Sequence, residues 1–192
     1  MNHIIGLVIS ILLFGFFILV ALSFNTNVTT ATYQSTLVNN TQQSIVDLAE
    51  IINFDFSKIG FRKPAPKFKA GALSSTSCYW YSDFDNDGDM DSVYYFIENR
   101  ETQGPNPNIQ YLYRRINNEK AIKIGLGIVS FNMIYYDSSR TQINYSQLSD
   151  ISGVNKIRGI KVQLTLESQY KINNEYSSTY WEKTFVPKSL NY

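Results

Sequence analysis

The first sixty residues constrain this chain most strongly. No charged side chain occurs from Ile4 to Phe24. At about 1.5 Å per residue, a helix over this segment is about 31 Å long, close to the roughly 30 Å hydrocarbon core of a bilayer. We therefore predict that residues 1–24 form a transmembrane helix.

The helical pattern continues beyond this segment, because no Gly or Pro occurs between Gly15 and Gly60. Apolar and small residues recur at steps of three and four along one face, most strongly from Ile45 to Ile59. This periodicity predicts one helix of ~55 residues. Its second part, residues 25–60, is expected to pack on a globular domain.

Two alternatives remain open for this region. Ala21-Leu22-Ser23 has the small-x-small form of a signal-peptide cleavage site, but no Lys or Arg precedes the apolar run and the run exceeds the usual 7–15 residues. A disordered stalk over the polar segment Asn25–Asn53 is the second alternative. The apolar stripe from Ile45 onward favours a retained, continuous helix.

The chain changes period after Gly60, where Pro64 and Pro66 are expected to separate the helix from the rest of the chain. Residues 61–192 are rich in Tyr, Phe, Ser, Thr and Asn, and apolar residues alternate with polar ones in several short runs. We predict an α+β fold in which the long helix covers one face of one antiparallel sheet. The expected strands are Cys78–Tyr81, Ser92–Ile97, Ile109–Ile116, Ile128–Tyr136, Ile157–Leu166 and Ser178–Val186.

An acidic segment separates the first two expected strands. Carboxylates occupy every second position, at Asp83, Asp85, Asp87, Asp89 and Asp91, with Gly88 where a loop would turn. Each close pair of carboxylates repels by about 0.7 kcal/mol at 6 Å in water. A counter-charge is therefore expected to hold them together.

Calcium fits this pattern, because it takes six to eight oxygen ligands and a D-x-D-x-D-G loop makes alternate side chains converge. In such a loop Asp83, Asp85 and Asp87 would supply side-chain oxygens and Asp89 its backbone carbonyl. Asp91 would supply a closing carboxylate or a water-mediated contact. The twelfth position is Tyr94, so the segment resembles the calcium loops of dockerin and FG-GAP repeats and not an EF-hand. A solvated hairpin turn at Asn86-Asp87-Gly88 is the alternative.

Several classes of function lack the residues that they need. The single histidine, His3, lies at the edge of the apolar segment, so no Ser-His-Asp or Cys-His arrangement and no zinc site can be assembled. We therefore expect no enzyme and no small-molecule substrate. The formal net charge of +1, with scattered Lys and Arg, gives no reason to expect a nucleic-acid partner. The single cysteine, Cys78, is expected to be a buried thiol.

Most of the chain resembles the type IV pilin and type II secretion pseudopilin family. The resemblance rests on the helix exit Leu48-Ala49-Glu50-Ile51-Ile52 to Gly60-Phe61-Arg62, on Tyr94-Tyr95-Phe96 followed by Tyr111-Leu112-Tyr113-Arg114-Arg115, and on two closing strands. These strands are Gly127–Tyr136 and Ile157–Leu166. The resemblance implies a pilin-like fold, a bacterial inner-membrane anchor with a single span, and a periplasmic or extracellular C-terminal domain.

One position departs from the family pattern. The family's leader is cut after a Gly and followed by Phe or Met, with Glu at the fifth mature position. The candidate cleavage site here is Gly6 followed by Leu7, and the fifth position would be Ile11. This departure is compatible with a subunit at the tip of a filament, or with a pilin-like protein that does not polymerise.

The resemblance leaves two functions to be compared. The first is a structural minor pilin or pseudopilin that takes part in initiation, capping or assembly of a filament, with lipid and the N-terminal helices of other pilin-like subunits as partners. The second is a calcium-stabilised β domain, tethered outside the membrane for adhesion or ligand binding.

Overall fold

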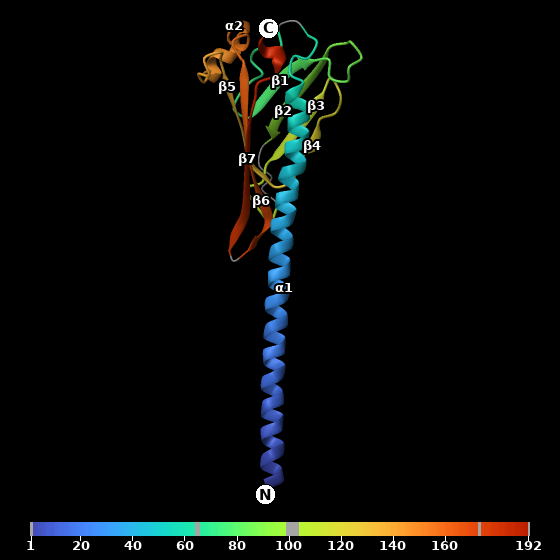
Figure 1. Ribbon diagram of the computed structural model, residues 1–192, viewed down its shortest axis with the longest axis vertical. Coiled ribbons are helices and arrows are strands. Elements are labelled where there is room, and N and C mark those ends of the chain that lie inside the picture. Colours follow the sequence, from blue (N-terminus) through green and yellow to red (C-terminus); the bar gives the residue numbers. More distant parts are fainter. Residues whose placement is uncertain (1, 64–65, 99–103, 173, 192) are drawn as a thin grey trace. The chain divides into compact units, whose positions relative to one another are not determined.

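A computed structural model of the chain describes residues 2–63, 66–98, 104–172 and 174–191 (Figure 1). Contacts divide the chain into two units, the first ending at Asn39 and the second beginning at Asn40. Helix α1, Asn2–Ser57, begins in the first unit and ends in the second, which confirms the prediction of one long N-terminal helix. This helix is long and apolar enough to cross a membrane. Pro64 lies outside the described residues.

Strands in the second unit form two sheets among the described residues, where the sequence predicted one. The first has the order β1-β2-β3-β4 and the second β5-β6-β7, and every pairing is antiparallel. Alternation along a strand shows which face is buried but not which strand lies beside it, so this division could not be read from the sequence. The strands are β1 (Ser77–Ser82), β2 (Asp91–Glu98), β3 (Tyr111–Ile116), β4 (Ile122–Ile124), β5 (Ile128–Tyr136), β6 (Gly159–Ile172) and β7 (Glu175–Phe185).

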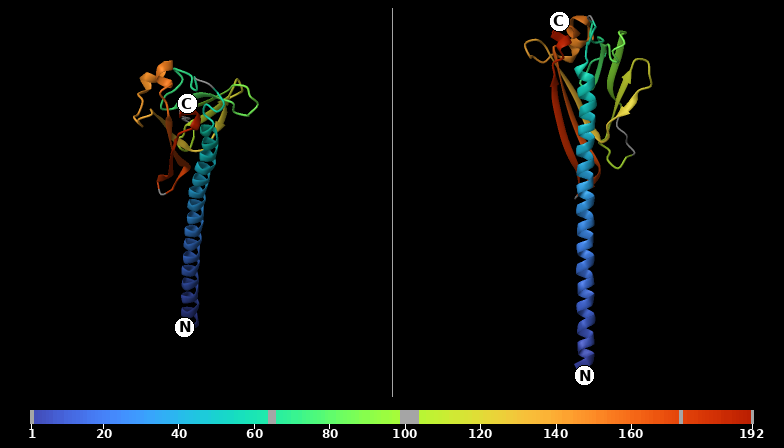
Figure 2. Two further views of the ribbon diagram at one scale, coloured as in Figure 1. Left: turned by 45° about the horizontal axis from the view of Figure 1, so that its top comes forward. Right: turned by 45° about the vertical axis from the view of Figure 1, so that its right-hand side comes forward.

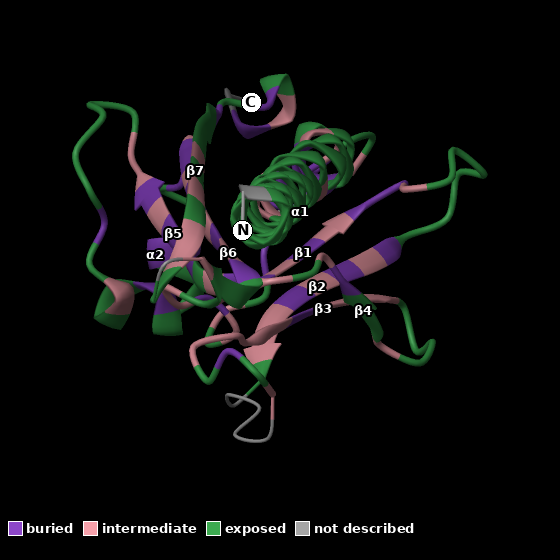
Figure 3. Ribbon diagram, turned by 90° about the horizontal axis from the view of Figure 1, so that it is seen from below, coloured by how far each residue is buried: buried purple, intermediate pink, exposed green. Residues whose placement is uncertain are grey.

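The six expected strands are present, Ile128–Tyr136 with the predicted bounds and the other five with shifted ends, and one strand was not predicted. That strand, β4, is only three residues long, and β6 continues past Leu166 to Ile172. Short helices η1 (Tyr145–Ser149) and α2 (Ile151–Val154) connect β5 to β6, and η2 (Lys188–Asn191) follows β7. Figure 3 shows buried and partly buried residues alternating along β1 and β2, as expected for strands with one covered face.

The last turns of α1 provide that cover. Figure 2 shows them beside both sheets. Four α1 residues of the predicted stripe, Ile45, Ala49, Ile52 and Phe56, are buried in the second unit, and Leu48, which lies beside the stripe, is buried as well. The stripe that the sequence indicated from Ile45 onward is therefore the face that packs on the β domain.

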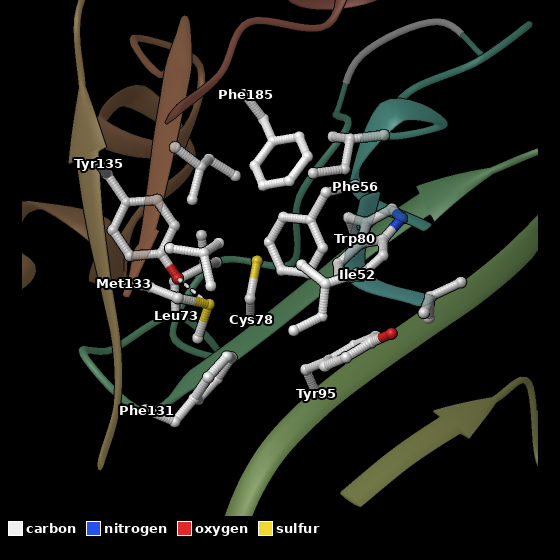
Figure 4. Packing of buried hydrophobic residues seen from close by; sticks show 14 of the residues in the cluster. Ile52, Phe56, Leu73, Cys78, Trp80, Tyr95, Phe131, Met133, Tyr135 and Phe185 are labelled. Carbon is white, nitrogen blue, oxygen red and sulfur yellow. Dashed lines mark hydrogen bonds between the residues drawn. The ribbon is translucent and has the colours of Figure 1, made fainter. Parts of the chain in front are cut away.

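Phe56 joins the two sheets at the centre of this core (Figure 4). Its ring centroid lies 4.9 Å from that of Trp80 and 5.4 Å from that of Tyr95, both in the first sheet. It lies 5.3 Å from that of Phe185, at the end of β7 in the second sheet. Burial of a Phe side chain contributes about 1.5–3 kcal/mol, and aromatic pairs of this kind add to it.

Cys78 is buried in the same core, as the sequence predicted. Burial raises the pKa of its thiol to about 12, although a hydrogen bond with Tyr135 opposes the rise. The thiol therefore stays protonated and unreactive at neutral pH.

A buried ionic cluster fixes α1 on the first sheet. Asp55 is 1% exposed, and its carboxylate accepts hydrogen bonds from Arg114 Nε at 2.5 Å and Nη2 at 3.0 Å. The Tyr95 hydroxyl donates to the same carboxylate at 2.5 Å. Burial, and then the charge of Asp55, raise the pKa of Tyr95 well above its usual value, so the hydroxyl remains a donor. All three groups are satisfied only when this helix face meets β2 and β3.

We predict that Asp55→Ala lowers the free energy of unfolding by about 2–4 kcal/mol, because it leaves the Arg114 charge and the Tyr95 hydroxyl without their shared partner. Urea unfolding of the full chain in detergent micelles, followed through the fluorescence of Trp80 and Trp181, measures this loss. Glu50→Ala removes an exposed carboxylate from the same helix and should change stability by no more than about 0.5 kcal/mol. A similar small change for Asp55→Ala would show that the ionic cluster does not hold the helix.

Candidate metal site

The acidic segment forms the loop between β1 and β2. The two strands pair as a hairpin whose last register pair is Ser82 with Asp91. This pairing places Asp83, the first loop residue, next to the start of β2. The chain therefore brings both ends of the acidic segment together before any ligand is considered.

Three of the five carboxylates converge. One oxygen from each of Asp83, Asp85 and Asp91 lies within 4.8 Å of the other two. Asp83 is 1% exposed and Asp91 is 9% exposed, whereas Asp85 is on the surface. Among the described residues, no other group of three His, Cys, Asp or Glu side chains meets in this way.

Asp87 and Asp89 lie outside this group and belong to the turn. The Asp87 backbone N–H donates to Asp85 Oδ1 at 3.2 Å, and the Asp89 N–H donates to Asp87 Oδ1 at 2.7 Å. Asn86 and Gly88 have positive φ angles of 70° and 99°, which Asn and Gly tolerate best. These local bonds shape the turn, and they use one carboxylate oxygen of Asp87.

Asp91 is held in place from outside the loop. Its Oδ2 accepts the Phe84 N–H at 2.8 Å, and its Oδ1 accepts the Asn117 side-chain amide at 2.6 Å. Burial alone would raise the pKa of Asp91, but the hydrogen bonds from Asn117, Phe84 and Asp85 and the charge of Lys63 outweigh it, so the pKa falls below its usual value. The Asp91 carboxylate is therefore ionised and held in one orientation at neutral pH.

Asp83 lacks such partners. Both of its carboxylate oxygens are buried, and they accept no hydrogen bond from any residue that the structure describes. Arg62 Nη1 lies 3.8 Å from Asp83 Oδ2, beyond hydrogen-bond distance, and the Arg62 side chain is 57% exposed. A buried carboxylate without donors is costly, because burial removes its hydration and nothing replaces it.

A calcium ion fits this arrangement. Calcium binds oxygen at 2.3–2.6 Å, so two oxygens on one ion are at most about 5 Å apart, and the three carboxylates satisfy that limit. The ion would also supply the missing partner of Asp83. Water and backbone carbonyls would have to complete the six to eight ligands.

The candidate leader residues lie in the other unit. Gly6 and Leu7 are exposed helical residues of α1. Ser10 donates its hydroxyl to the Gly6 carbonyl at 2.9 Å, a local bond within the helix. Nothing about these residues distinguishes a cleavage site from an ordinary turn of helix.

Two residues near the acidic loop were not predicted from the sequence. Asn117 lies in the turn after β3 and Arg62 lies just after α1, both more than twenty positions from the residues that they contact. No local pattern marks such residues. Only the pairing of β2 with β3, and the return of the chain after α1, bring them to the loop.

Comparisons with known proteins add no relative: no family model, no curated protein and no solved structure matches this chain. The α+β architecture and the converging carboxylates are therefore the basis on which a function is proposed.

We predict that Asn117→Gly lowers the free energy of unfolding by about 1–2 kcal/mol. The Asn117 side chain donates to the Asp91 carboxylate and accepts the Ser92 N–H at 2.8 Å, and both bonds are lost. Glycine accommodates the φ of 49° at this position, so backbone strain does not contribute. Asn118→Gly, at the exposed neighbouring position, is the control in urea unfolding of the full chain. Equal losses in both variants would show that Asn117 does not support Asp91.

Proposed function

We propose that the chain is a pilin-like structural subunit, anchored by α1 in a bacterial inner membrane. One observation carries the proposal. The same helix contains an uncharged segment long enough to span a bilayer and, further along, the buried stripe that packs on the β domain. An anchor that is also a core element is what the resemblance to pilins and pseudopilins implies.

The exposed side of α1 supports contacts with other helices. Within the second unit, Val46, Ile51 and Phe54 are exposed apolar residues of the helix, at 49%, 37% and 54%. Large exposed apolar patches mark sites of protein–protein or membrane interaction, and these three side chains would contribute to such a patch. Partner helices of other pilin-like subunits are the occupants that we propose for this face.

Ile11 stands where the family has a Glu, and this difference bears on where in a filament the subunit would lie. A subunit that lacks the family's Glu is better suited to initiating or capping a filament than to repeating along it. The β domain would then lie in the periplasm or outside the cell. The protein would act by assembly and not by catalysis.

We predict that Phe54→Cys, labelled through its thiol with a photoactivatable cross-linker, cross-links to other proteins with apolar N-terminal helices when native membranes are illuminated. Cys78 is buried and should not react. Mass spectrometry of the cross-linked bands identifies the partners. Ser178→Cys, exposed on β7, is the matched control and should give no such product.

Two results would contradict this function. One is the same set of products from Phe54→Cys and Ser178→Cys. The other is an intact mass showing cleavage after Ser23, because that cut removes the apolar segment. An uncut chain, or one cut after Gly6, retains the helix.

A second candidate function rests on the buried carboxylate of Asp83, which accepts no hydrogen bond from the described residues. We propose that Asp83, Asp85 and Asp91 bind a calcium ion, which neutralises the loop and stabilises the β1–β2 turn. A calcium-stabilised domain tethered outside the membrane would also serve adhesion or ligand binding. The ion has a structural role in either function.

We predict that calcium raises the melting temperature of the full chain in micelles. At ten times the dissociation constant the ion contributes about 1.4 kcal/mol, equivalent to roughly 3–5 °C for a domain of this size. Asp85→Asn should abolish the rise, because Asp85 belongs to the converging group. Asp89→Asn removes the same charge from the same loop, outside the group, and should retain most of it. No rise in the unmodified chain, or equal behaviour of the two variants, would contradict the proposed site.

A further inference from the structure

The segment that follows α1 surrounds the acidic loop with positive charge. Lys58, Arg62 and Lys63 occur within six residues, and all three contact the loop. Two of these contacts are to backbone carbonyls and one is to a carboxylate, so the three residues have different roles.

Two of the three cations bind backbone, not carboxylates. Lys58 Nζ donates to the Phe84 carbonyl at 2.7 Å, and Lys63 Nζ donates to the Gly88 carbonyl at 3.2 Å. Lys58 also lies over the rings of Phe54 and Phe84, at 4.1 and 4.7 Å from their centroids. These contacts attach the loop to the segment after α1 and use none of its carboxylate oxygens.

Arg62 differs, because its nearest loop partner is a carboxylate. Among the described residues, it is the only Lys or Arg within 4.0 Å of the converging group, with Nη1 3.8 Å from Asp83 Oδ2. The approach is set by the backbone: the Asp83 N–H donates to the Phe61 carbonyl at 3.0 Å, and the Gly60 N–H donates to the Tyr81 carbonyl at 3.0 Å. These bonds hold the backbone of Arg62 next to Asp83.

A divalent ion and the Arg62 guanidinium would compete for the same carboxylate oxygen of Asp83. A divalent ion bound to Asp83 would lie within a few ångströms of the Arg62 guanidinium. At about 5 Å in water, the repulsion between charges of +2 and +1 weakens binding roughly tenfold. Without the ion, the guanidinium is the closest compensation that the buried carboxylate has. Its side chain is 57% exposed and is free to move away.

We propose that Arg62 is the internal counter-ion of Asp83 and competes with the divalent cation, so that it determines the affinity of the site. This inference rests on the proposed calcium site. It implies that Arg62 stabilises the ion-free domain and weakens binding. It places the dissociation constant toward the 10⁻⁴–10⁻³ M range that is typical of extracellular calcium modules.

The test separates affinity from stability in the full chain in micelles. Calcium affinity is measured by isothermal titration calorimetry, and the melting temperature is measured with a chelator present. For Arg62→Gln we expect a lower melting temperature without calcium and a roughly tenfold lower dissociation constant. Arg62→Lys keeps the charge, so its calcium dissociation constant should stay close to that of the unmodified chain.

Two controls define what overturns the inference. Lys183→Gln removes one positive charge from β7, in the other sheet, and should leave the affinity unchanged. Lys63→Gln removes a neighbouring charge that binds a carbonyl, and should tighten binding less than Arg62→Gln. If Lys63→Gln raises the calcium affinity as much as Arg62→Gln does, the effect comes from the summed positive charge of the segment. That result would overturn the proposed competition between Arg62 and calcium.

The inference and the calcium site fail in different ways. If neither the unmodified chain nor Arg62→Gln binds calcium, the calcium site is wrong and the inference falls with it. If the unmodified chain binds calcium and Arg62→Gln binds with equal or lower affinity, the site stands and the counter-ion role of Arg62 is overturned. A purely structural role would lower the melting temperature without tightening binding.

Discussion

The contact of Phe56 with both sheets is the interaction on which the second unit depends. Neither sheet is closed on itself, and each needs its apolar face covered. Phe56 touches Trp80 and Tyr95 on one side and Phe185 on the other. The preceding residue, Asp55, adds direction to this packing, because its bonds to Arg114 and Tyr95 are made at one rotation of the helix only. The apolar contacts supply the stability and the ionic cluster selects the register, a division of roles that is best attested for buried polar groups in helix packing.

Much of this arrangement could be predicted from the sequence, and the failures have a common cause. The extent of α1 followed from the uncharged segment Ile4–Phe24 and from the absence of Gly and Pro between Gly15 and Gly60. Most of its packing face followed from the spacing of Ile45, Ala49, Ile52 and Phe56. These signals are local. The division into two sheets, and the short strand β4, depend on which strands pair, and alternation carries no information about partners. The polar residues of β6 after Leu166 are held in the strand by pairing with β7.

The same distinction applies to the acidic loop. Its sequence indicated five carboxylates in a turn around Gly88, and the structure brings Asp83, Asp85 and Asp91 together. The hairpin pairing explains why the two ends of the loop converge, while the local bonds of Asp87 and Asp89 explain why its tip does not. Carboxylates at every second position converge on one point only if the backbone keeps the same curvature along the whole loop. Here Asn86 and Gly88 have positive φ angles, which change the direction of the backbone at the tip of the loop.

The loop and the end of α1 are physically one structure, which links the two proposals. The bonds from Asp83 to Phe61 and from Gly60 to Tyr81 join the loop and the adjoining end of β1 to the chain directly after the helix. Any ligand that binds the folded loop and not the unfolded one stabilises that junction by RT ln(1 + [L]/Kd). If α1 anchors the chain as proposed, a load on the β domain would reach the helix through this junction as well as through the packing around Phe56. A weak calcium site would then make the strength of the junction depend on calcium outside the membrane, while Arg62 would keep it folded where calcium is scarce.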